Sequence, residues 1–531
     1  MPLYSLVIGP IFIATVGYFL PRHVFKYVLL ASQLVLFGLA VSLLISVRAD
    51  GELLQQVGGW PAGIGIALRA DLLGSTMVLF TTLIYLFLIV YSFQKQYTDN
   101  MFQFLFLVIQ GVTISVFLSQ DVFNIYVLVE VMTIIISVLI MWKRGKQAIY
   151  DGTLYLLINL AAMSFFLLGV GFVYRSLGAL NFQIMSARVE MISDVRTLIL
   201  PFALLMTAIG LKSAIMPVFT WLPHAHGTPS APSIVSAALS GLLVKVGVYL
   251  FIRVRAIFSE AFVIDEFFLV IGGATAIIGF LLALTQKDMK LILAYSTVSQ
   301  IGLIMVGLNS GVQESFLGGQ FHILNHGIFK AVLFLGAGAI AKEYGTKDVN
   351  QIRGVFRRMP VIGTAITLAM LGIIGTPFFN GAISKYLIQE GFAGIPDLTV
   401  YFINFGTTLV FVKFAAILFG PRGERTQPRD PFVESSLAVM SVFVVIMGVY
   451  ARPIIGYLFG INVSVEGAYY LDKVIAYVLT VGIAVAVYYF GLRKAAFLRT
   501  IREFRFEFPN VALFLCIYFA SITGYLFLFV A

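Results

Sequence analysis

Residues 321–345 read FHILNHGIFKAVLFLGAGAIAKEYG, a mostly apolar run that carries two histidines and two lysines. As an α-helix, a run of roughly 20 apolar residues is long enough to cross a hydrocarbon core of about 30 Å. Similar runs recur along the chain, of whose 531 residues 60% are hydrophobic and 11% charged, whereas soluble domains usually carry about 25% charged residues. The sequence therefore predicts an all-α integral membrane protein.

We expect about sixteen transmembrane helices, because that many apolar runs reach the necessary length. The expected spans are 4–20, 26–47, 71–93, 101–118, 122–142, 153–174, 197–220, 231–256, 264–286, 290–308, 315–341, 360–390, 399–419, 433–459, 467–492 and 508–530. The connections are too short for a soluble catalytic or nucleic-acid-binding domain of about 100 residues. Function is therefore expected to lie within the membrane.

Basic residues gather in the loops that follow odd-numbered helices, above all in residues 143–146, 342–358 and 493–505. The positive-inside rule predicts that these loops are cytoplasmic, which places both termini outside a multi-pass protein of the cell membrane. This distribution also explains the net charge of +10, so we expect no nucleic-acid partner.

The single cysteine, Cys516, excludes an intrachain disulfide and an iron-sulfur cluster. We therefore expect no cofactor, and any redox chemistry would belong to another subunit. Residues 1–23 lack a basic leader region and a small-residue cleavage site, which predicts a retained first helix.

The chain is expected to divide into four parts. Residues 1–100 would hold helices one to three with a small extracytoplasmic hairpin around GGWPAGIGIALRAD (58–71). Residues 101–256 and 264–419 would form two five-helix repeats, inverted because five is odd. Residues 433–531 would hold the last helices, joined by the basic amphipathic connector GLRKAAFLRTIREFRFEFPN (491–510).

Helices seven and twelve are expected to be broken, since each contains a proline inside a long apolar run that also holds a lysine. These prolines are Pro217 and Pro377. A break in lipid is tolerated only where protein or water satisfies the freed backbone groups, so each break should line a cavity.

Five ionisable residues fall at the predicted depth of the membrane interior: Glu130, Lys212, Lys245, Lys330 and Lys385. A charge there costs about 2.5–3.5 kcal/mol on insertion scales, so pairing and hydration must compensate it. We expect Glu130 to face Lys212, and a lysine balanced between burial and a carboxylate can take up and release a proton. The alternatives are lysines that extend to the headgroups and a purely structural ion pair.

The quoted helix places His322, His326 and Lys330 at i, i+4 and i+8, on one side of the helix. Such a ladder of titratable groups can relay protons through bridging water. Two histidines at i and i+4 also suit a metal, but no HExxH pattern or third ligand is evident. Interhelical hydrogen bonding without proton movement is the remaining alternative.

Three further residues are supporting candidates: His224, His226 and Lys413. The histidines lie among three prolines in the expected loop WLPHAHGTPSAPS (221–233), either as a proton entry point or within a rigid turn. Lys413 falls in the fifth helix of the second repeat, as Lys245 does in the first. Lys290 is expected to be an anchor near the interface rather than a relay.

Together, five motifs resemble the antiporter-like subunits shared by respiratory complex I, Mrp sodium/proton antiporters and energy-converting membrane-bound hydrogenases. The resemblance covers roughly residues 60–420. The motifs are GLKSAIMPVFTWLPHAH (210–226), LLVKVGVY (242–249), QKDMKLILAYSTVSQIG (286–302), FHILNHGIFKAVLFLGAG (321–338) and GTPFFNGAISKYL (375–387).

The resemblance implies a fourteen-helix core with two inverted repeats, broken helices seven and twelve, and a mid-membrane chain of protonatable residues. It implies that Glu130 and Lys212 are the coupled pair, Lys245 the link, the 322–330 ladder the relay and Lys385 the terminal lysine. His224 departs from the family, which often has aspartate there, and residues 491–510 are too short for the long lateral helix of the largest complex I member. We therefore favour a D-type Mrp subunit or its counterpart in a hydrogenase.

The leading hypothesis is a proton-translocating subunit of a multisubunit membrane complex, with sodium/proton antiport as an open variant. Its expected partners are other membrane subunits, protons, sodium in the antiport variant and the lipid bilayer. One alternative is a structural subunit whose buried charges only fix assembly. Another is a stand-alone secondary transporter for an organic solute, which would need polar and aromatic groups around a central pocket.

Overall fold

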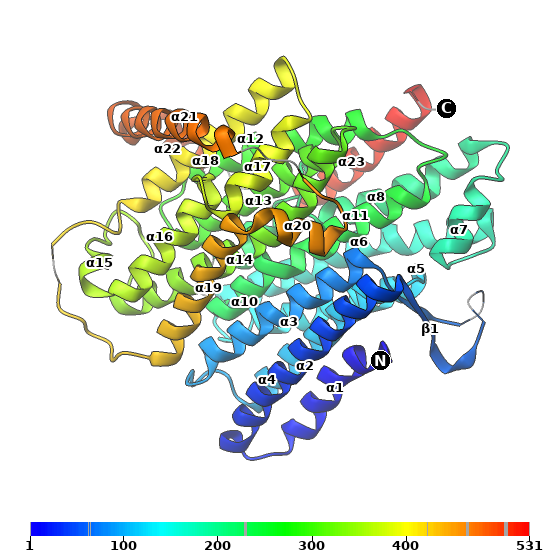
Figure 1. Cartoon of the computed structure of the whole chain (residues 1–531), viewed down its shortest axis with the longest axis horizontal. Helices are drawn as coiled ribbons and strands as arrows, with labels where there is room; N and C mark the ends of the chain where they lie inside the picture. The colour runs from blue at the N-terminus through cyan, green and yellow to red at the C-terminus, as the bar shows by residue number, and fades with distance from the viewer. Residues whose placement is uncertain are drawn as a thin grey trace. The chain divides into compact units, whose positions relative to one another are not determined.

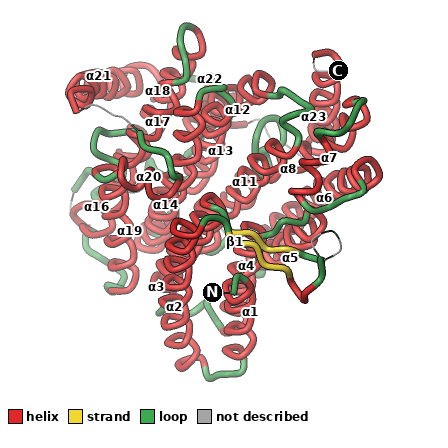
Figure 2. Tube along the Cα trace, turned by 45° about the vertical axis from the view of Figure 1, so that its right-hand side comes forward, coloured by secondary structure: helices red, strands yellow, loops and turns green. Residues whose placement is uncertain are grey.

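The computed structural model describes residues 2–61, 63, 65–227, 231–421, 423–463, 467–503 and 508–529. Helices dominate these residues, as Figure 2 shows, and 14 of the described helices are long and apolar enough to cross a membrane. Two shorter apolar helices, Tyr4–Tyr18 and Pro360–Ile374, accompany them. The prediction of an all-α integral membrane fold is confirmed, and each expected span overlaps one of these helices.

The chain divides into two compact units, each assembled from separate stretches of sequence. Unit 1 comprises Met1–Ser213, Leu242–Ile264 and Phe508–Ala531, and unit 2 comprises Ala214–Gly241 and Asp265–Glu507. Two returns of the chain therefore complete unit 1, one near its middle and one at its C-terminal end.

Unit 1 is a helical bundle with one small hairpin. Its first helices, α1, α2, α3 and α4, pack side by side in sequence-adjacent pairs, and α1 also packs on α4 (Figure 1). Its elements are α1 (Tyr4–Tyr18), α2 (Arg22–Asp50), β1 (Leu53–Gln56), β2 (Ala67–Ala70), α3 (Leu72–Ser92), α4 (Asn100–Leu118), α5 (Val122–Ile140), α6 (Lys146–Leu177), α7 (Phe182–Val189), α8 (Ile199–Lys212), α11 (Val244–Ile257) and α23 (Phe508–Phe529).

The hairpin between α2 and α3 is an antiparallel pair in which Leu53 lies opposite Ala70 and Gln56 opposite Ala67. Its second strand falls inside the stretch 58–71, whereas its first strand precedes that stretch. Figure 2 shows this pair in yellow beside the first helices. The turn between the strands includes residues 62 and 64, which lie outside the described residues.

Unit 2 is also helical, and α14 lies at its centre, with packing contacts to α10, α13, α16, α17 and α19. Its elements are α9 (Trp221–Gly227), α10 (Ser233–Ala238), α12 (Asp265–Thr285), α13 (Met289–Leu308), α14 (Gln313–Tyr344), α15 (Val355–Arg358), α16 (Pro360–Ile374), α17 (Asn380–Glu390), α18 (Ile395–Ala415), α19 (Pro431–Val449), α20 (Ala451–Phe459), α21 (Gly467–Ala486) and α22 (Phe497–Glu503).

Aspartate caps set the starts of several spanning helices. The carboxylates of Asp71, Asp99 and Asp121 accept hydrogen bonds of 2.8, 2.8 and 2.7 Å from backbone N–H groups three residues further on. These bonds satisfy N–H groups that have no partner inside the helix. At the other end, Gly178 and Gly345 adopt left-handed conformations that stop the long helices α6 and α14.

Both expected helix breaks are present. Helix α8 ends at Lys212 and α9 begins at Trp221, while α16 ends at Ile374 and α17 begins at Asn380. The backbone at the breaks is hydrogen-bonded: the N–H of Met216 donates to Thr275 Oγ1 (2.9 Å). Likewise, the side-chain amide of Asn325 donates to the carbonyl of Asn380 (2.8 Å). Protein groups thus provide hydrogen-bond partners for some of the backbone groups that the helix breaks leave without partners.

Small residues allow a close helix contact in unit 2, between α12 and α13. A Cβ atom at Gly279 would lie 2.4 Å from the backbone N of Ser299, and one at Gly302 would lie 2.3 Å from the backbone N of Ala276. Larger residues would force the helices apart, as is typical of tightly packed membrane helices. This contact fixes α13, which carries several partners of the buried ionisable groups.

Several sequence-based boundaries were wrong. Helix α6 begins at Lys146 rather than 153, because its first turns are polar and Gln147 bonds to the buried Asp151 (3.0 Å). The single span expected at 433–459 is two helices, α19 and α20, which join at Tyr450. The expected loop at 221–233 begins with the helix α9, because Pro223 lies in a first turn where no N–H partner is needed. Pro229 and residues 504–507 of the basic connector lie outside the described residues.

Candidate functional site

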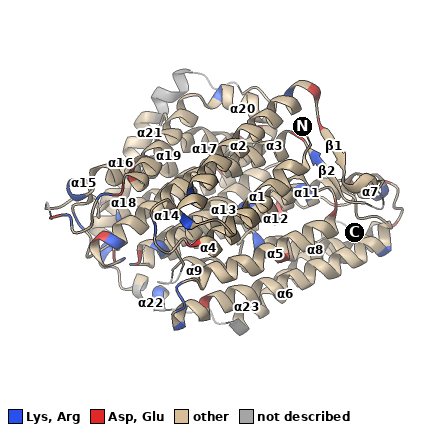
Figure 3. Ribbon diagram, turned by 90° about the horizontal axis from the view of Figure 1, so that it is seen from below, with Lys and Arg blue, Asp and Glu red and all other residues tan. Residues whose placement is uncertain are grey.

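Charged side chains lie mostly at helix ends and in loops, but a few basic segments lie within the helices around α13 and α14 (Figure 3). Lys245 and Lys330 have no exposed surface, and Lys385 is 5% exposed. Because an isolated charge at such positions is strongly unfavourable, their surroundings decide what these groups can do.

In unit 1, Lys212 at the end of α8 reaches towards α5. Its ammonium donates a 2.6 Å hydrogen bond to Thr133 Oγ1, and the Thr133 hydroxyl in turn donates to the carbonyl of Val129 (2.8 Å). Glu130 precedes Thr133 by three residues, which places the two on one side of α5, and its charge interacts with that of Lys212. Lys212 therefore contacts Thr133 on the same side of α5 as Glu130, and among the described residues no hydrogen bond or ion pair joins Lys212 directly to Glu130.

Glu130 is half-buried, and its Oε2 atom is buried without a hydrogen-bond partner among the described residues. A carboxylate oxygen in that position can accept a proton or a water molecule. The Lys212 ammonium thus has two acceptors nearby: the Thr133 hydroxyl, which it contacts, and the Glu130 carboxylate.

Lys245 lies in the first turn of α11, immediately after a π-helical turn at Leu239–Leu243. Two residues later, Gly247 packs against the end of α8: a Cβ there would lie 2.5 Å from the backbone N of Ser213 and 2.7 Å from the carbonyl carbon of Lys212. This close approach holds the helix of Lys245 against the end of α8, where Lys212 lies.

In unit 2, the ladder on α14 has the geometry expected from its spacing. His322, His326 and Lys330 are fully buried, and the two imidazole rings are nearly parallel, with centroids 6.3 Å apart. Helices α13 and α17 supply polar contacts to this side of α14. All three groups therefore belong to one buried polar face.

His322 is held by hydrogen bonds at both ring nitrogens. Its Nε2 lies 3.0 Å from Gln300 Oε1, and its Nδ1 lies 2.8 Å from Ser384 Oγ. Gln300 donates through Nε2 to Thr407 Oγ1 (3.1 Å), whose own hydrogen goes to the carbonyl of Ile403 (3.0 Å). Gln300 Oε1 must therefore accept, so His322 Nε2 carries a hydrogen.

This arrangement leaves His322 Nδ1 as the variable atom. When the ring is neutral, Nδ1 accepts from the Ser384 hydroxyl. When the ring is charged, Nδ1 donates to Ser384 Oγ, whose hydrogen then turns to the carbonyl of Gly381 (3.3 Å) or Asn380 (3.4 Å). Ser384 can therefore serve both protonation states without moving its oxygen.

Lys330, at the other end of the ladder, is bound to α13. Its ammonium donates to the carbonyl of Leu293 (2.9 Å) and to the hydroxyl of Ser296, and it lies 5.8 Å from the centroid of the Phe411 ring. These contacts partly replace the water that an ammonium would otherwise hold. No carboxylate is among these contacts, so a change in its charge is not opposed by a paired anion.

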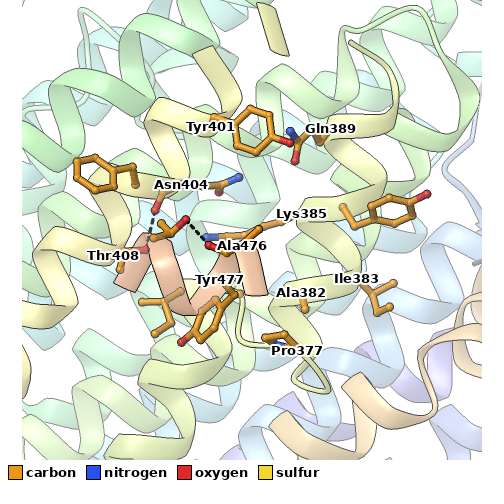
Figure 4. Close-up of a pocket in the computed structure, with 15 residues that line it drawn as sticks. Pro377, Ala382, Ile383, Lys385, Gln389, Tyr401, Asn404, Thr408, Ala476 and Tyr477 are labelled. Carbon is orange, nitrogen blue, oxygen red and sulfur yellow. Dashed lines mark hydrogen bonds between the residues drawn. The ribbon is translucent and has the colours of Figure 1, made fainter. Parts of the chain in front are cut away.

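Lys385 follows Ser384 on α17 and lines a cavity of about 300 Å³ between α17, α18 and α21. Figure 4 shows its side chain extending into the space beside Ala476 and Tyr477 of α21. Its ammonium has no hydrogen-bond partner among the described residues, and the same holds for Asn404 Oδ1 on α18. A cavity of this size with unpaired polar groups has room for several water molecules.

The supporting candidates lie in different environments. His226 is fully buried and stacks on Phe334 of α14 with ring centroids 4.6 Å apart, whereas His224 is half-buried. The ammonium of Lys413 donates to the carbonyls of Leu284 (2.7 Å) and Gln286. Lys290 donates to the carbonyl of Ala231 (2.8 Å), which ties α13 to the segment before α10.

Four polar residues at these sites had not been singled out from the sequence: Thr133, Gln300, Ser384 and Thr407. The partners across the bundle lie between 22 and 107 residues away in the chain. A hydroxyl or amide inside an apolar run usually bonds its own helix, so its presence alone indicates no site. Within the described ranges, no group of three or more His, Cys, Asp or Glu residues is placed to hold a metal ion.

Known membrane proteins resemble this chain over most of its length. The protein family described as NADH:quinone oxidoreductase/Mrp antiporter, TM, matches residues 119–410. The D-type subunit of the Na(+)/H(+) antiporter of Alkalihalophilus pseudofirmus is 28% identical over 435 residues, which cover 79% of this chain and 87% of the relative. The N-type subunit of the NADH-quinone oxidoreductase of Desulforudis audaxviator is 30% identical over 399 residues, which cover 73% of this chain and 79% of the relative.

Two solved structures share the fold. A chain of the Mrp complex from Dietzia sp. DQ12-45-1b matches with a TM-score of 0.78 and 22% identity, covering 94% of this chain and 99% of that one. A chain of the membrane-bound sulfane sulfur reductase, an archaeal respiratory membrane complex, matches with a TM-score of 0.78 and 23% identity. The match covers 90% of this chain and 99% of that one. At these sequence identities the two structures show a shared fold alone.

Proposed function

Since this chain belongs to the NADH:quinone oxidoreductase/Mrp antiporter transmembrane family, we propose that it is a proton-translocating subunit of a multisubunit membrane complex. Its curated relatives include subunits of an antiporter and of an NADH-quinone oxidoreductase, which supports other membrane subunits as its partners. The buried ionisable groups described above carry the ion.

The observation that carries this proposal is the continuous polar face of unit 2. Lys330, His326 and His322 follow one another on α14, and Ser384 joins His322 to the segment that bears Lys385. Lysine and histidine exchange protons and do not bind a hard cation, which favours the proton as the ion on this path. The unpaired ammonium of Lys385 and its cavity form the hydrated end of the path.

A proton moves along this face by changes of hydrogen-bond direction. A proton that arrives at His322 Nδ1 turns Ser384 from donor to acceptor, and its release to water near Lys385 turns Ser384 back. Gln300 keeps the Nε2 hydrogen in place throughout, so only one ring nitrogen exchanges. Unit 1 works by the same principle: the Lys212 ammonium is held by Thr133 when the Glu130 carboxylate is protonated and is drawn to Glu130 when it is ionised.

Sodium/proton antiport is the second candidate, because the curated relatives include the D-type subunits of two Na(+)/H(+) antiporters. In this case the described lysines and histidines move the proton, and oxygen ligands elsewhere in the complex move sodium. The two candidates differ in whether proton movement requires a sodium gradient.

The placement in the membrane is part of the proposal. The basic loops suggest that residues 143–146 and 342–358 face the cytoplasm, with both termini outside the cell membrane. The two helix breaks support the assignment of residues 101–256 and 264–419 as inverted repeats, with residues 1–100 and 433–531 flanking them. In this frame each repeat contributes one broken helix and one basic centre.

The test uses the purified complex in liposomes that contain a trapped pH-sensitive dye. Proton uptake is driven either by an imposed membrane potential or by a sodium gradient, for wild type, Glu130→Ala and Lys212→Ala. We expect both variants to assemble and to take up protons about 10²-fold more slowly. A loss of this size is typical when a positioned group that transfers a proton is removed. Glu190→Ala and Lys146→Ala, which change exposed charges of the same unit, are the controls.

Proton uptake at the wild-type rate in both Glu130→Ala and Lys212→Ala would refute the proposal in favour of the structural alternative. Uptake driven by the sodium gradient but not by the potential would favour antiport.

A further inference from the structure

A second pocket in unit 2, of about 370 Å³, lies where the segment after α14, the end of α18 and the segment after α21 meet. Its lining includes three basic residues, Arg353, Lys413 and Arg493, and two tyrosines, Tyr488 and Tyr489. The described lining contains no acidic residue. The relay on α14 does not use this pocket.

The three basic groups are arranged by depth. Lys413 is 7% exposed and forms the base, Arg353 is half-buried in the wall, and Arg493 is exposed at the mouth, 5.7 Å from the centroid of the Tyr489 ring. The order from buried to exposed gives the pocket an entrance from the surface.

Each basic group retains hydrogens for a ligand. The Lys413 ammonium gives two of its three hydrogens to the carbonyls of Leu284 and Gln286. Arg353 Nη1 donates to the carbonyl of Val349 (2.6 Å) and to that of Ile352, which leaves Nε and Nη2 for another acceptor. The segment that carries Arg353 is fixed, since the N–H of Gly354 donates to the carbonyl of Phe419 (3.0 Å).

Among the described residues, the lining of the pocket carries three basic side chains and no acidic one. Lys413 also lies near two further cations, Lys287 and Arg502, and near one carboxylate, Asp348. Such a concentration of positive charge in a partly desolvated pocket attracts an anion.

The surroundings indicate the chemistry of that anion. The outward surface of α21 and of the π-helical turn after it is apolar and exposed, as at Val478, Ile483 and Phe490. Arginine pairs suit phosphate oxygens, and basic pockets between helices on the cytoplasmic side bind anionic headgroups. An exposed apolar face beside a basic pocket matches a molecule with a phosphate head and acyl chains.

We propose that this pocket binds the headgroup phosphate of an anionic phospholipid, with Arg353 and Arg493 as direct ligands and Lys413 at its base. The acyl chains lie along α21. The bound lipid bridges the basic side chains of three segments: the one after α14, the end of α18 and the one after α21. This assignment does not depend on which ion the complex moves.

The test measures lipid retention by the intact complex. The complex is delipidated in a neutral detergent, then mixed with phosphatidylglycerol, phosphatidylcholine or inorganic phosphate, and bound lipid is counted by native mass spectrometry. We expect wild type to regain phosphatidylglycerol in preference to phosphatidylcholine, and Arg353→Gln/Arg493→Gln to bind it about tenfold more weakly or worse. The control Arg144→Gln/Lys146→Gln removes the same charge from exposed positions of unit 1 and should bind like wild type.

Equal retention by wild type and the double variant would overturn the proposal, as would inorganic phosphate that fills the pocket and excludes phosphatidylglycerol. Arg493→Gln alone is the second variant, because Arg493 is exposed and its loss does not disturb the packing around Gly354. It should weaken phosphatidylglycerol binding in a complex that assembles normally, and unchanged binding in this single variant would also overturn the proposal.

Discussion

At the scale of single residues, the direct hydrogen-bond partners of Lys212, Lys330 and His322 are neutral groups rather than opposite charges. Lys212 bonds to Thr133, Lys330 to Ser296 and a backbone carbonyl, and His322 to Gln300 and Ser384. Neutral hydroxyl and amide groups hold a proton carrier without trapping its charge, whereas a tight buried ion pair would hold it permanently.

Thr133 should matter for translocation although it has no titratable group. In Thr133→Val the Lys212 ammonium loses its direct acceptor at unchanged side-chain size, and hydrogen bonds to charged groups contribute about 1.5–3 kcal/mol. We expect voltage-driven proton uptake to fall about tenfold or more in Thr133→Val and to recover in Thr133→Ser. A valine variant as fast as wild type would show that Lys212 does not depend on this contact.

Gln300 should act as a positioning residue for His322. Gln300→Leu removes the acceptor of the Nε2 hydrogen, so the ring can exchange at either nitrogen and the direction of the Ser384 bond is no longer fixed. We expect a loss of proton uptake of about tenfold or more, and a smaller loss in Thr407→Val, where Gln300 remains but can rotate. Gln351→Leu, which changes an exposed glutamine of the same unit, is the control, and equal rates in all four proteins would contradict the assignment.

At the scale of elements, the start of α3 is tied to α11 by a half-buried ion pair between Arg253 and Asp71. Asp71 caps α3 and receives two hydrogen bonds of 2.6 Å from Arg253. Arg253 also donates to Tyr249, whose hydroxyl bonds to the carbonyl of Phe117 at the end of α4 (2.6 Å). Three helices of unit 1 thus meet at one network, and α11, which carries Lys245, is held by it.

Asp71→Asn should destabilise unit 1, because it removes the negative charge that accepts both hydrogen bonds from the Arg253 guanidinium. A hydrogen bond to a charged group contributes about 1.5–3 kcal/mol, and the change is measured as a loss of thermal stability of the complex in detergent. Glu52→Gln, which changes an exposed partner of Arg69, should have little effect. A stability difference below about 1 kcal/mol would contradict a structural role for the pair.

The same pair predicts a dependence on pH. Burial raises the pKa of Asp71, but the hydrogen bonds and charge of Arg253 outweigh this, so its pKa lies below the ordinary value. The stabilisation is therefore fully present above the unfolded pKa of about 3.9 and is lost as pH falls through the lower folded value. The stability difference between wild type and Asp71→Asn should stay constant from about pH 7 to pH 5 and shrink only below that range. A difference that vanished near neutral pH would contradict the assignment.

At the scale of the whole molecule, hydropathy and motif spacing predicted more of the fold than the local helix propensity of single residues did. The approximate positions of the spans, both breaks and the family were predicted correctly, because the bilayer imposes helix length and the motifs at 210–226 and 321–338 keep their spacing. Helix α9 was missed because the proline in its first turn resembles a loop signal in the sequence. The division of α19 from α20 was missed because the single residue that separates them, Tyr450, does not interrupt the apolar run. The partners Thr133, Gln300 and Thr407 were missed because their contacts are long-range.

The proposed roles of the site residues rest on one claim: buried lysine and histidine side chains pass protons along each unit. Helix α14 offers a matched pair for testing it, because Lys330 is fully buried on the relay face and Lys342 is exposed at the end of the same helix.

The most direct measurement is voltage-driven proton uptake by the reconstituted complex with Lys330→Met, beside Lys342→Met. Methionine is unbranched like lysine and one heavy atom shorter, and it lacks the ammonium, so the packing around the stem is retained while proton transfer is lost. The account predicts intact assembly and a loss of uptake of about 10²-fold in Lys330→Met, with the wild-type rate in Lys342→Met. Uptake at the wild-type rate in Lys330→Met would contradict it.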